Sequence, residues 1–428
     1  MSVPDPLRVI LDARFVDGSS GGIQQWVIGL ASALSNLDDL TEEYLFLVTE
    51  GHDGWLQPFL GGRSRLLQDQ AVVRAAAPAS RPNHLRGLSR LSPRVPILRS
   101  MRRKARQAAA ASPARPSVRA VEGAGAHVMH FTRQAAFSTS VPSIYQPWDL
   151  QHLHVPEFFT EADRIHREQA YRAYCDQAQL IIVPTRWVKD DVVMQYGLSV
   201  DQIAVVNPPP PIAAYVPPTA SEEAEIATRL ELPPGFLFYP AQPWRHKNHE
   251  RLLAAVADLR RGGVEIPVIF SGRKTERTVA LEELARELRL GEQVRFLGFV
   301  NTTEIQVLYR RATCLVFPSL YEGWGLPIVE AFAAGLPVAS SNVTSLPALV
   351  GDAGLLFDPY EPSSIADAVR RLWTDPQLRE ALIERGRARA AQFEWRRTAL
   401  LMRAHYRTVA GRPLTDADRD LLAAPSVI

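Results

Sequence analysis

Residues 313–338 constrain the fold of this chain more than any other stretch of the sequence. The run 313–317 is short and apolar, which is typical of a buried strand in a parallel sheet. Gly323 and Gly325 follow in a loop that allows close backbone approach, and Pro327 suits the first turn of a helix. The free amides at such a helix start favour a bound anion, such as a diphosphate. The stretch therefore predicts a strand, loop and helix unit of an α/β protein, with an anion site at its loop.

Strands and helices alternate throughout the second half of the chain. Short apolar runs at 236–239, 266–270, 294–297 and 314–317 are separated by stretches with helical spacing. This alternation predicts a parallel sheet, and right-handed crossovers make it doubly wound, with helices on both faces. Ligands bind such sheets beyond the carboxyl ends of the strands, so the residues that follow each run are candidates for a binding site.

The first half of the chain begins with the same unit. An apolar run at 7–11 leads into a loop at 17–22, and apolar residues then recur at helical spacing from 23 to 34. Further strands are expected at 44–48, 127–131, 143–145, 180–183 and 203–206. The loop lacks the Gly-x-Gly-x-x-Gly fingerprint, which argues against a bound dinucleotide. We therefore expect a second α/β domain, whose ligand is not a dinucleotide.

A proline-rich segment divides the two halves. Six prolines lie between residues 208 and 218, which favours an extended linker. The expected domains are residues 1–207 and residues 219–394, and each is long enough to bury its own core.

Cysteine usage and hydropathy bear on the cellular compartment. The chain has two cysteines, Cys175 and Cys314, which form neither a disulfide framework nor a metal-ligand pattern. No apolar run is long enough to cross a bilayer, and the first residues lack the basic and apolar regions of a signal peptide. We expect a cytoplasmic protein.

The net charge of +2 conceals one strongly basic segment. Between Arg74 and Arg119 the chain carries eleven arginines and one lysine but no acidic residue, within an apparent insertion at 74–124. A helix over 97–108 would gather cations on one face. These cations are Arg99, Arg102, Arg103, Lys104 and Arg106. They favour attachment to an anionic membrane surface, with a solvated loop as the alternative, and the lack of interleaved aromatic residues argues against nucleic acid.

Glu322 and Glu330 flank the loop and helix start described first, with seven residues between them. This spacing, with Gly-x-Gly-Leu-Pro inside it, resembles the Glu-x(7)-Glu motif of the retaining GT-B glycosyltransferases, a family-4-like group that includes mannosyltransferases. The resemblance covers residues 7–50 and 127–410. It implies two Rossmann-like, doubly wound parallel-sheet domains that face a cleft. It also implies that residues 395–428 form a helix and tail that return to the N-terminal domain.

The same resemblance implies a reaction. A hexose would move from a sugar nucleotide to a hydroxyl of a glycan or of a lipid-linked saccharide, and the loop at 149–159 favours mannose. The anomeric configuration would be retained, and neither a metal nor a cofactor would be required. Many members of this group use lipid-linked acceptors to build surface polysaccharides, which would suit a protein on the inner face of the cytoplasmic membrane.

The resemblance assigns the donor site to loops at strand ends. Glu322 would approach the donor sugar, Glu330 would hold the nucleotide ribose, and Arg245 and Lys247 would bind the phosphates. The full set assigned to the donor is Gly21, Gly22, Arg245, Lys247, Ser271, Gly272, Gly298, Phe299, Gly323, Trp324, Gly325, Leu326 and Glu330.

The expected catalytic loop departs from the family pattern at Trp148. Family mannosyltransferases have a histidine before the aspartate of this loop, near the reaction centre, whereas here Trp148 precedes Asp149. The hydrogen-bonding role of that histidine at the reaction centre must then fall to Asp149, His152 or His154, or be absent. We take Asp149, His152 and Glu322 as the candidate catalytic residues.

Two other functions remain open on the same scaffold. One is a sugar-nucleotide epimerase, which would need acid and base carboxylates in the cleft. The other is a partner subunit that binds the donor without transferring it. Trp148 and Ala348, at positions where a histidine and a glutamate are expected, raise this second alternative.

Overall fold

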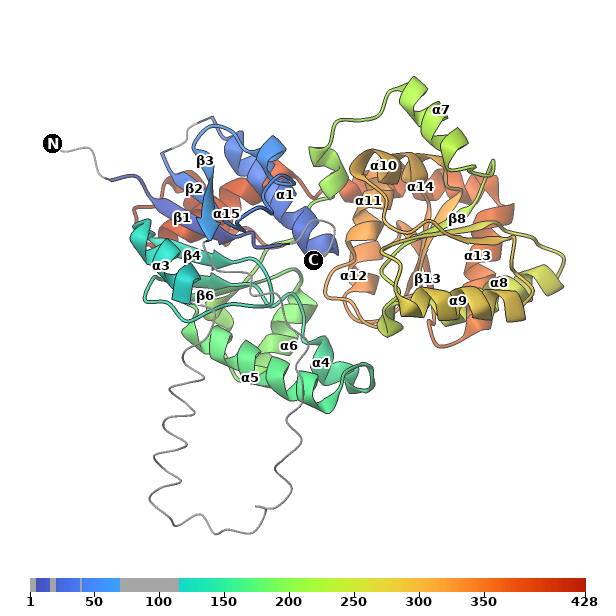
Figure 1. Ribbon diagram of the computed structural model, residues 1–428, viewed down its shortest axis with the longest axis horizontal. Coiled ribbons are helices and arrows are strands. Elements are labelled where there is room, and N and C mark those ends of the chain that lie inside the picture. The colour runs from blue at the N-terminus through green and yellow to red at the C-terminus, as the bar shows by residue number, and fades with distance from the viewer. Residues whose placement is uncertain (1–4, 16–20, 39–40, 70–114) are drawn as a thin grey trace, which may run out of the picture.

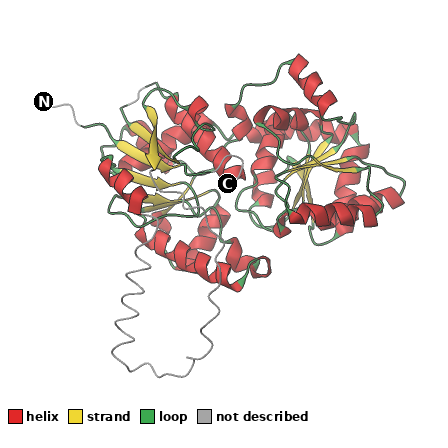
Figure 2. Ribbon diagram, in the orientation of Figure 1, coloured by secondary structure: helices red, strands yellow, loops and turns green. Residues whose placement is uncertain are grey.

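The computed structural model describes residues 5–15, 21–38, 41–69 and 115–428. Within these residues two α/β domains stand side by side and are joined by a linker (Figures 1 and 2). No helix in the described part of the chain combines the length and the apolar character needed to cross a bilayer. The basic residues 99–106 lie outside the described ranges, so their attachment to a membrane stays a prediction.

The N-terminal domain is built on a seven-stranded sheet in which every pairing is parallel, in the order β3-β2-β1-β4-β5-β6-β7. Its strands are β1 (Arg8–Asp12), β2 (Glu43–Thr49), β3 (Ser64–Asp69), β4 (Val128–Phe131), β5 (Ser143–Tyr145), β6 (Leu180–Val183) and β7 (Ile203–Val205). Its helices are α1 (Gly21–Ser35), α3 (Arg115–Gly123), α4 (Gln151–His154), α5 (Glu161–Gln177) and α6 (Arg186–Tyr196). The 3-10 turns are η1 (Gln57–Phe59), η2 (Pro156–Phe158), η3 (Val200–Gln202) and, in the linker, η4 (Pro211–Ala214).

The C-terminal domain is built on a six-stranded parallel sheet in the order β10-β9-β8-β11-β12-β13. Its strands are β8 (Leu237–Pro240), β9 (Val268–Ser271), β10 (Val294–Phe296), β11 (Cys314–Phe317), β12 (Val338–Ser341) and β13 (Gly354–Phe357). Its helices are α7 (Ala220–Arg229), the turn η5 (Arg245–Lys247), α8 (His249–Arg261), α9 (Glu276–Glu287), α10 (Thr302–Arg311), α11 (Leu326–Ala334), α12 (Leu346–Val350), α13 (Pro362–Thr374) and α14 (Pro376–Ala390). The chain continues through α15 (Trp395–Val409) and α16 (Asp416–Ala423).

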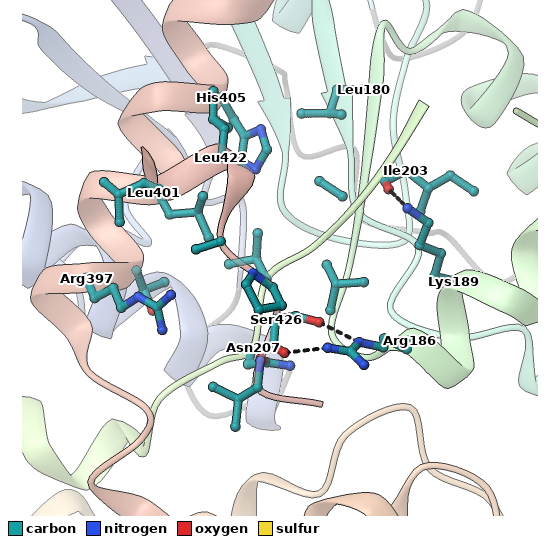
Figure 3. Close-up of a pocket in the computed structure, with 18 of the residues that line it drawn as sticks. Leu180, Arg186, Lys189, Ile203, Asn207, Arg397, Leu401, His405, Leu422 and Ser426 are labelled. Carbon is teal, nitrogen blue, oxygen red and sulfur yellow. Dashed lines mark hydrogen bonds between the residues drawn. The ribbon is translucent and has the colours of Figure 1, made fainter. Parts of the chain in front are cut away.

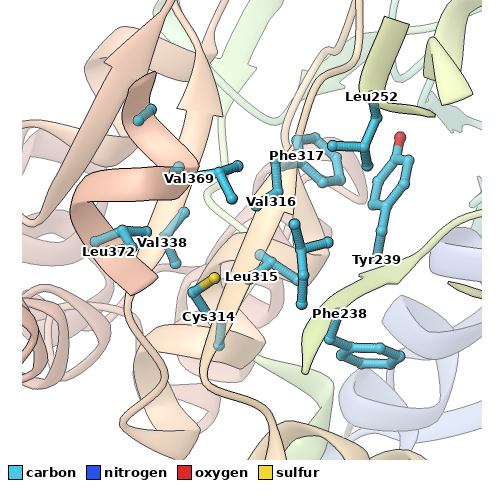
Figure 4. Packing of buried hydrophobic residues seen from close by; sticks show 14 of the residues in the cluster. Phe238, Tyr239, Leu252, Cys314, Leu315, Val316, Phe317, Val338, Val369 and Leu372 are labelled. Carbon is cyan, nitrogen blue, oxygen red and sulfur yellow. The ribbon is translucent and has the colours of Figure 1, made fainter. Parts of the chain in front are cut away.

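Successive residues of a central strand enter different cores. In β1, Val9 and Leu11 belong to one apolar cluster and Ile10 to another, because side chains alternate between the two faces of the sheet. Both faces are covered, which explains why the strands are continuous apolar runs. The C-terminal domain has one large core, in which Phe238 and Leu315 lie among the side chains drawn in Figure 4.

Helix α15 comes near the end of the chain but packs on the N-terminal domain (Figure 1). Its residues Met402 and Tyr406 lie in the same apolar cluster as strand β1. At Gly29 the helix α1 approaches so closely that an added Cβ would lie 1.9 Å from the indole ring of Trp395. The last helices therefore tie the end of the chain to its first domain.

The structure differs from the sequence patterns at several elements. Strands β3, β12 and β13 were not among the strands that the patterns predict. Both β3 and β13 are edge strands with partly exposed side chains, and β12 carries two buried serines, so none of them is a continuous apolar run. Residues 115–123, which fall within the predicted insertion, form α3 and pack against β3.

Gly29→Ala should destabilise the protein by about 1–3 kcal/mol, because the new methyl group would overlap the Trp395 ring and force α1 away from α15. Thermal or urea unfolding would measure the change. Gly123→Ala is the matched control, since nothing lies within 4 Å of a Cβ built at that exposed position. A Gly29→Ala protein as stable as wild type would contradict the close contact between the two helices.

Candidate active site

The two domains enclose a cavity of about 1400 Å³. Its walls are the loops that follow strands β5, β8, β9, β10 and β11, together with the amino ends of helices α1 and α11. These loops lie at the carboxyl ends of both parallel sheets, where ligands of such sheets bind. Pockets for single small ligands are commonly about 300–1000 Å³, so this cavity has room for two substrates.

Most of the residues expected to bind the donor line this cavity. They are Gly21, Gly22, Arg245, Lys247, Ser271, Gly272, Phe299, Gly323, Trp324, Gly325, Leu326 and Glu330. Gly298 does not line it, but its carbonyl accepts a hydrogen bond of 2.9 Å from the Gly272 amide and so connects the loops after β9 and β10. Gly272 has a φ of 146°, and an added Cβ there would lie 2.5 Å from the carbonyl oxygen of Ala241. The backbone of this loop is therefore held against the loop after β8.

The backbone of the Glu322 loop is fastened at two points. The Glu322 amide donates to Thr344 Oγ1 over 3.2 Å, and Ser345 Oγ donates to the Glu322 carbonyl over 2.9 Å. Gly325, with a φ of 115°, then turns the chain into α11, a conformation that side-chain-bearing residues rarely adopt. The carboxylate of Glu322 is thereby held in a defined place at the cavity.

Glu322 forms an ion pair with Lys247, which follows strand β8. Lys247 Nζ lies 2.5 Å from Glu322 Oε1, and the two side chains are only 14% and 13% exposed. Tyr239 OH donates to the Lys247 carbonyl over 2.9 Å, and Asn248 Nδ2 donates to the Pro318 carbonyl over 2.9 Å. The first bond ties the turn after β8 to its own strand, and the second ties it to the loop after β11. The cavity therefore presents an ammonium and a carboxylate in direct contact.

Arg245 supplies a second cation to the cavity. Its side chain is exposed and makes no ion pair with any residue of the described ranges. A guanidinium with free donors suits a phosphate group, which it can bind through two parallel hydrogen bonds. Across the same ranges, no cluster of three or more histidine, cysteine, aspartate or glutamate side chains is arranged to hold a metal ion.

Asp149 enters the cavity from the N-terminal domain, in the loop after β5. Burial raises the pKa of its carboxyl to about 6, and the negative charge of Glu322 adds to the rise, while Lys247 opposes it. The Gln151 amide donates to Asp149 Oδ1 over 3.1 Å and orients the carboxyl. The cavity therefore contains a carboxyl group that titrates close to neutral pH.

Trp148 lines the cavity, and its ring packs into the core of the N-terminal domain. Its backbone has a positive φ of 72°, and its Nε1 donates to the Thr132 carbonyl over 2.9 Å. The ring packs edge-on against Trp26, with centroids 5.9 Å apart. An added Cβ at Gly323 would lie 2.4 Å from the carbonyl oxygen of Trp148, so the two domains touch here at a glycine.

Neither histidine of the expected catalytic loop lines the cavity. His152 is fully buried, and its Nε2 lies 3.1 Å from Glu168. His154 pairs with Asp191 at 2.8 Å and stacks on the ring of Tyr321 from the C-terminal domain. Both histidines lie on the short helix α4, whose successive side chains point in different directions, so they do not follow Asp149 into the cavity. The geometry thus favours the aspartate over His152 as the group nearest the reaction.

Glu330 lies on helix α11, and its side chain lines the cavity. Tyr309 OH on α10 donates to Glu330 Oε2 over 2.7 Å. Burial raises the pKa of this carboxyl to about 7, because the charged form loses most of its hydration. Ligand hydroxyls that donate to the carboxylate would replace that hydration.

Several residues of the cavity wall belong to no spaced motif and were missed at the sequence level. Trp55 and Phe59 come from the connection between β2 and β3, Arg167 from α5, and Tyr215 from the linker between the domains. The Arg167 guanidinium lies 4.8 Å from the centre of the Phe159 ring. Their only signal in the sequence is the aromatic or basic character of the side chain.

A second cavity, of about 630 Å³, lies between α6, β7, α15 and α16 (Figure 3). Arg186 donates to the Ser426 carbonyl over 2.8 Å, and Lys189 donates to the Ile203 carbonyl over 2.6 Å. Residues 425–427 themselves form part of its wall. We interpret it as the joint between the N-terminal domain and the segment after α16 rather than as a substrate site.

Two Rossmann-like domains that face a common cavity form the GT-B fold of glycosyltransferases, and solved glycosyltransferase structures share this fold. The chain belongs to the family of glycosyl transferases group 1, whose profile matches residues 222–389.

The chain matches two curated relatives over about two thirds of each relative's length. O-antigen chain mannosyltransferase B of Escherichia coli is 33% identical over 56% of this chain and 63% of its own length. A D-inositol 3-phosphate glycosyltransferase of Corynebacterium urealyticum is 32% identical over 62% of this chain and 68% of its own length.

Two solved structures share the fold at low sequence identity. Sucrose-phosphate synthase of Thermosynechococcus elongatus superposes with a TM-score of 0.68 at 21% identity, covering 95% of this chain and 99% of the synthase. Anabaena HepE in complex with UDP-glucose gives a TM-score of 0.68 at 17% identity, covering 94% of this chain and all of HepE. At these identities the likeness shows the fold alone.

Glu330→Gln should raise the free energy of unfolding by about 1–3 kcal/mol at pH 8 and change it little at pH 4. The carboxyl has a pKa of about 7 in the folded protein against an ordinary value of 4.5. Between these values the folded protein holds a proton that the unfolded chain has lost, so stability falls as pH rises. Glutamine removes the cost of the buried charge and can still accept from Tyr309. Unfolding from pH 4 to 8 measures the effect, with Glu380→Gln on the surface as control, and parallel curves for wild type and Glu330→Gln would contradict it.

Proposed function

We propose that this protein is a retaining hexosyltransferase that moves a hexose from a sugar nucleotide to a hydroxyl group of an acceptor glycan or lipid-linked saccharide. The observation that carries the proposal is the Lys247–Glu322 ion pair, which shares the cavity with Arg245 and faces Asp149 from the other domain. Cations for a diphosphate and carboxylates for a sugar lie together in one cavity with room for donor and acceptor.

The donor's diphosphate fits the positive side of the cavity. Arg245 and Lys247 would pair with the phosphates, and the amino end of α11, where Gly325 and Leu326 line the cavity, adds the partial positive charge of the helix. Charge builds on the diphosphate as the sugar bond breaks, and fixed cations in a site with little water stabilise that charge. These cations support a transfer that needs no metal ion.

A same-face substitution is the mechanism that the residues support best. The acceptor oxygen would attack the anomeric carbon on the face from which the diphosphate departs, and the acceptor's proton would pass to the leaving phosphate oxygen. Glu322 is engaged by Lys247 and is therefore a poor nucleophile for a double displacement. In this scheme Glu322 binds the sugar, and ionised Asp149 stabilises positive charge that develops on the sugar ring.

The proposal also covers which sugar is transferred and which kind of molecule accepts it. The similarity to an O-antigen chain mannosyltransferase supports mannose as the transferred sugar and a polysaccharide precursor as the acceptor. A lipid-linked precursor would place the protein at the cytoplasmic face of a membrane.

Incubation with radiolabelled sugar nucleotides, with and without a membrane lipid extract, tests the proposal. Transfer of label into the extract, with release of nucleoside diphosphate and in the presence of EDTA, is the expected result. Conversion of the donor to another sugar nucleotide without any acceptor would instead identify an epimerase. Binding without turnover would identify a donor-binding partner subunit.

Glu322→Gln should lower turnover by about 10- to 100-fold while leaving the affinity for free nucleoside diphosphate within about threefold of wild type. Glutamine loses the charge that holds the sugar hydroxyls, but Lys247 keeps its own charge for the phosphates. Steady-state kinetics and calorimetry give the two quantities, and the exposed Glu380→Gln is the control. Wild-type turnover in Glu322→Gln would remove Glu322 from the sugar site.

We expect the kcat of wild type at saturating donor to fall below about pH 6, and Asp149→Asn should lower turnover and abolish this fall. The pKa of this carboxyl is raised to about 6, so the ionised form that supports the reaction is lost as pH drops through that value. Measuring kcat rather than kcat/KM keeps the titration of Glu330, which acts on donor affinity, out of the profile. An acid limb that persists in Asp149→Asn would show that another group controls it.

A further inference from the structure

The linker between the domains is held at one place beside the donor side of the cavity. Its turn η4 packs on both α1 and α11, the helix that carries Glu330 (Figure 1). Trp395 Nε1 donates to the Pro210 carbonyl over 3.1 Å and fixes the start of this turn. The residue that follows the turn is Tyr215, and its position is therefore set by both domains and by the last helices of the chain.

Tyr215 faces the cavity with a polar atom that has no partner. The residue lines the cavity, and its ring packs against that of Phe59, with centroids 6.0 Å apart. The hydroxyl oxygen is buried and makes no hydrogen bond with any described residue. Burial raises the pKa of Tyr215 above its usual range, and the nearby charge of Glu330 adds to the rise. A buried hydroxyl without a partner is costly, so such groups commonly mark a missing ligand.

Glu330 has one oxygen free for the same ligand. Tyr309 donates to Oε2, and no residue in the described part of the chain donates to Oε1. A ribose carries two adjacent hydroxyl groups, each of which can donate one hydrogen bond and accept others. One of them can donate to Glu330 Oε1, and the other can bond to the hydroxyl of Tyr215.

We propose that Tyr215, carried by the linker, completes with Glu330 a two-residue site for the ribose of the donor nucleotide. The inference rests on the proposed function, since it assumes that Glu330 binds the ribose of a sugar nucleotide. It adds a residue from outside both sheets, so that the donor contacts the linker as well as the C-terminal domain.

Calorimetry with UDP and GDP, and with their 2′-deoxy and 3′-deoxy counterparts, tests the inference on wild type and Tyr215→Phe. The variant keeps the ring and its packing on Phe59 but loses the hydroxyl. It should bind the ribonucleotide about tenfold more weakly than wild type. Its preference for the ribonucleotide over one of the two deoxy forms should shrink by the same factor. Tyr360→Phe, at a 51% exposed residue that does not line the cavity, is the matched control and should bind as wild type does.

The outcomes separate this inference from the proposed function. If wild type binds one of the ribonucleotides and Tyr215→Phe binds it equally well, with unchanged discrimination against both deoxy forms, the inference is overturned and the proposed function stands. If wild type binds neither UDP nor GDP, the donor assignment itself fails. Because the hydroxyl has no partner within the described residues, Tyr215→Phe should unfold at the same temperature as wild type or higher. A clear loss of stability would reveal an internal partner and would also overturn the inference.

Discussion

The two domains meet where a glycine lies against a backbone carbonyl. A Cβ at Gly323 would lie 2.4 Å from the carbonyl oxygen of Trp148, and one at Gly22 would lie 2.8 Å from the side chain of Leu326. A side chain at Gly323 would press on the backbone of Trp148, hold the domains apart and separate Asp149 from the groups of the C-terminal domain, whereas the flexible end of Leu326 can shift to admit one at Gly22. The cavity, and the charges that face each other across it, depend on this close approach. The positive φ of Trp148 belongs to the same contact, because it sets the direction of the carbonyl.

Burial shapes the charges of the cavity. Lys247 and Glu322 satisfy each other in a site with little exposure, whereas the exposed Arg245 forms no ion pair among the described residues. Glu330 and Asp149 have raised pKa values because each carboxyl is removed from water without a cation in contact with it. Groups that titrate near neutral pH cluster at functional sites, and both of these lie in the one cavity that the carboxyl ends of the two sheets share. The protein thus holds charge where a substrate can compensate it.

The two histidines that follow Asp149 show that residues close in sequence can point to different places in the fold. The sequence places His152 and His154 close to Asp149, which makes all three candidates for one role. In the structure the backbone enters the helix α4 directly after Leu150, and the helix directs His152 to Glu168 and His154 to Asp191. Sequence distance says little about direction in a helix, since neighbouring side chains diverge by about 100°. The aspartate remains in the loop and reaches the cavity.

Local sequence determined the parallel strands, the glycine turns and the residues that follow each strand, because apolar periodicity and backbone freedom act over a few residues. On that basis two doubly wound parallel-sheet domains could be predicted. The GT-B arrangement and the donor-site residues were implied by the family resemblance of the stretch from Glu322 to Glu330, and most of those residues line the shared cavity. The edge strands β3 and β13 escaped, since a partly exposed strand lacks a continuous apolar run. Only the tertiary structure decided that Asp149 faces Glu322, that α15 meets α1 at Gly29, and that Tyr215 lines the same cavity as Glu330. These contacts join residues far apart in the chain, and they arise from how two domains and a linker pack, which no local pattern encodes.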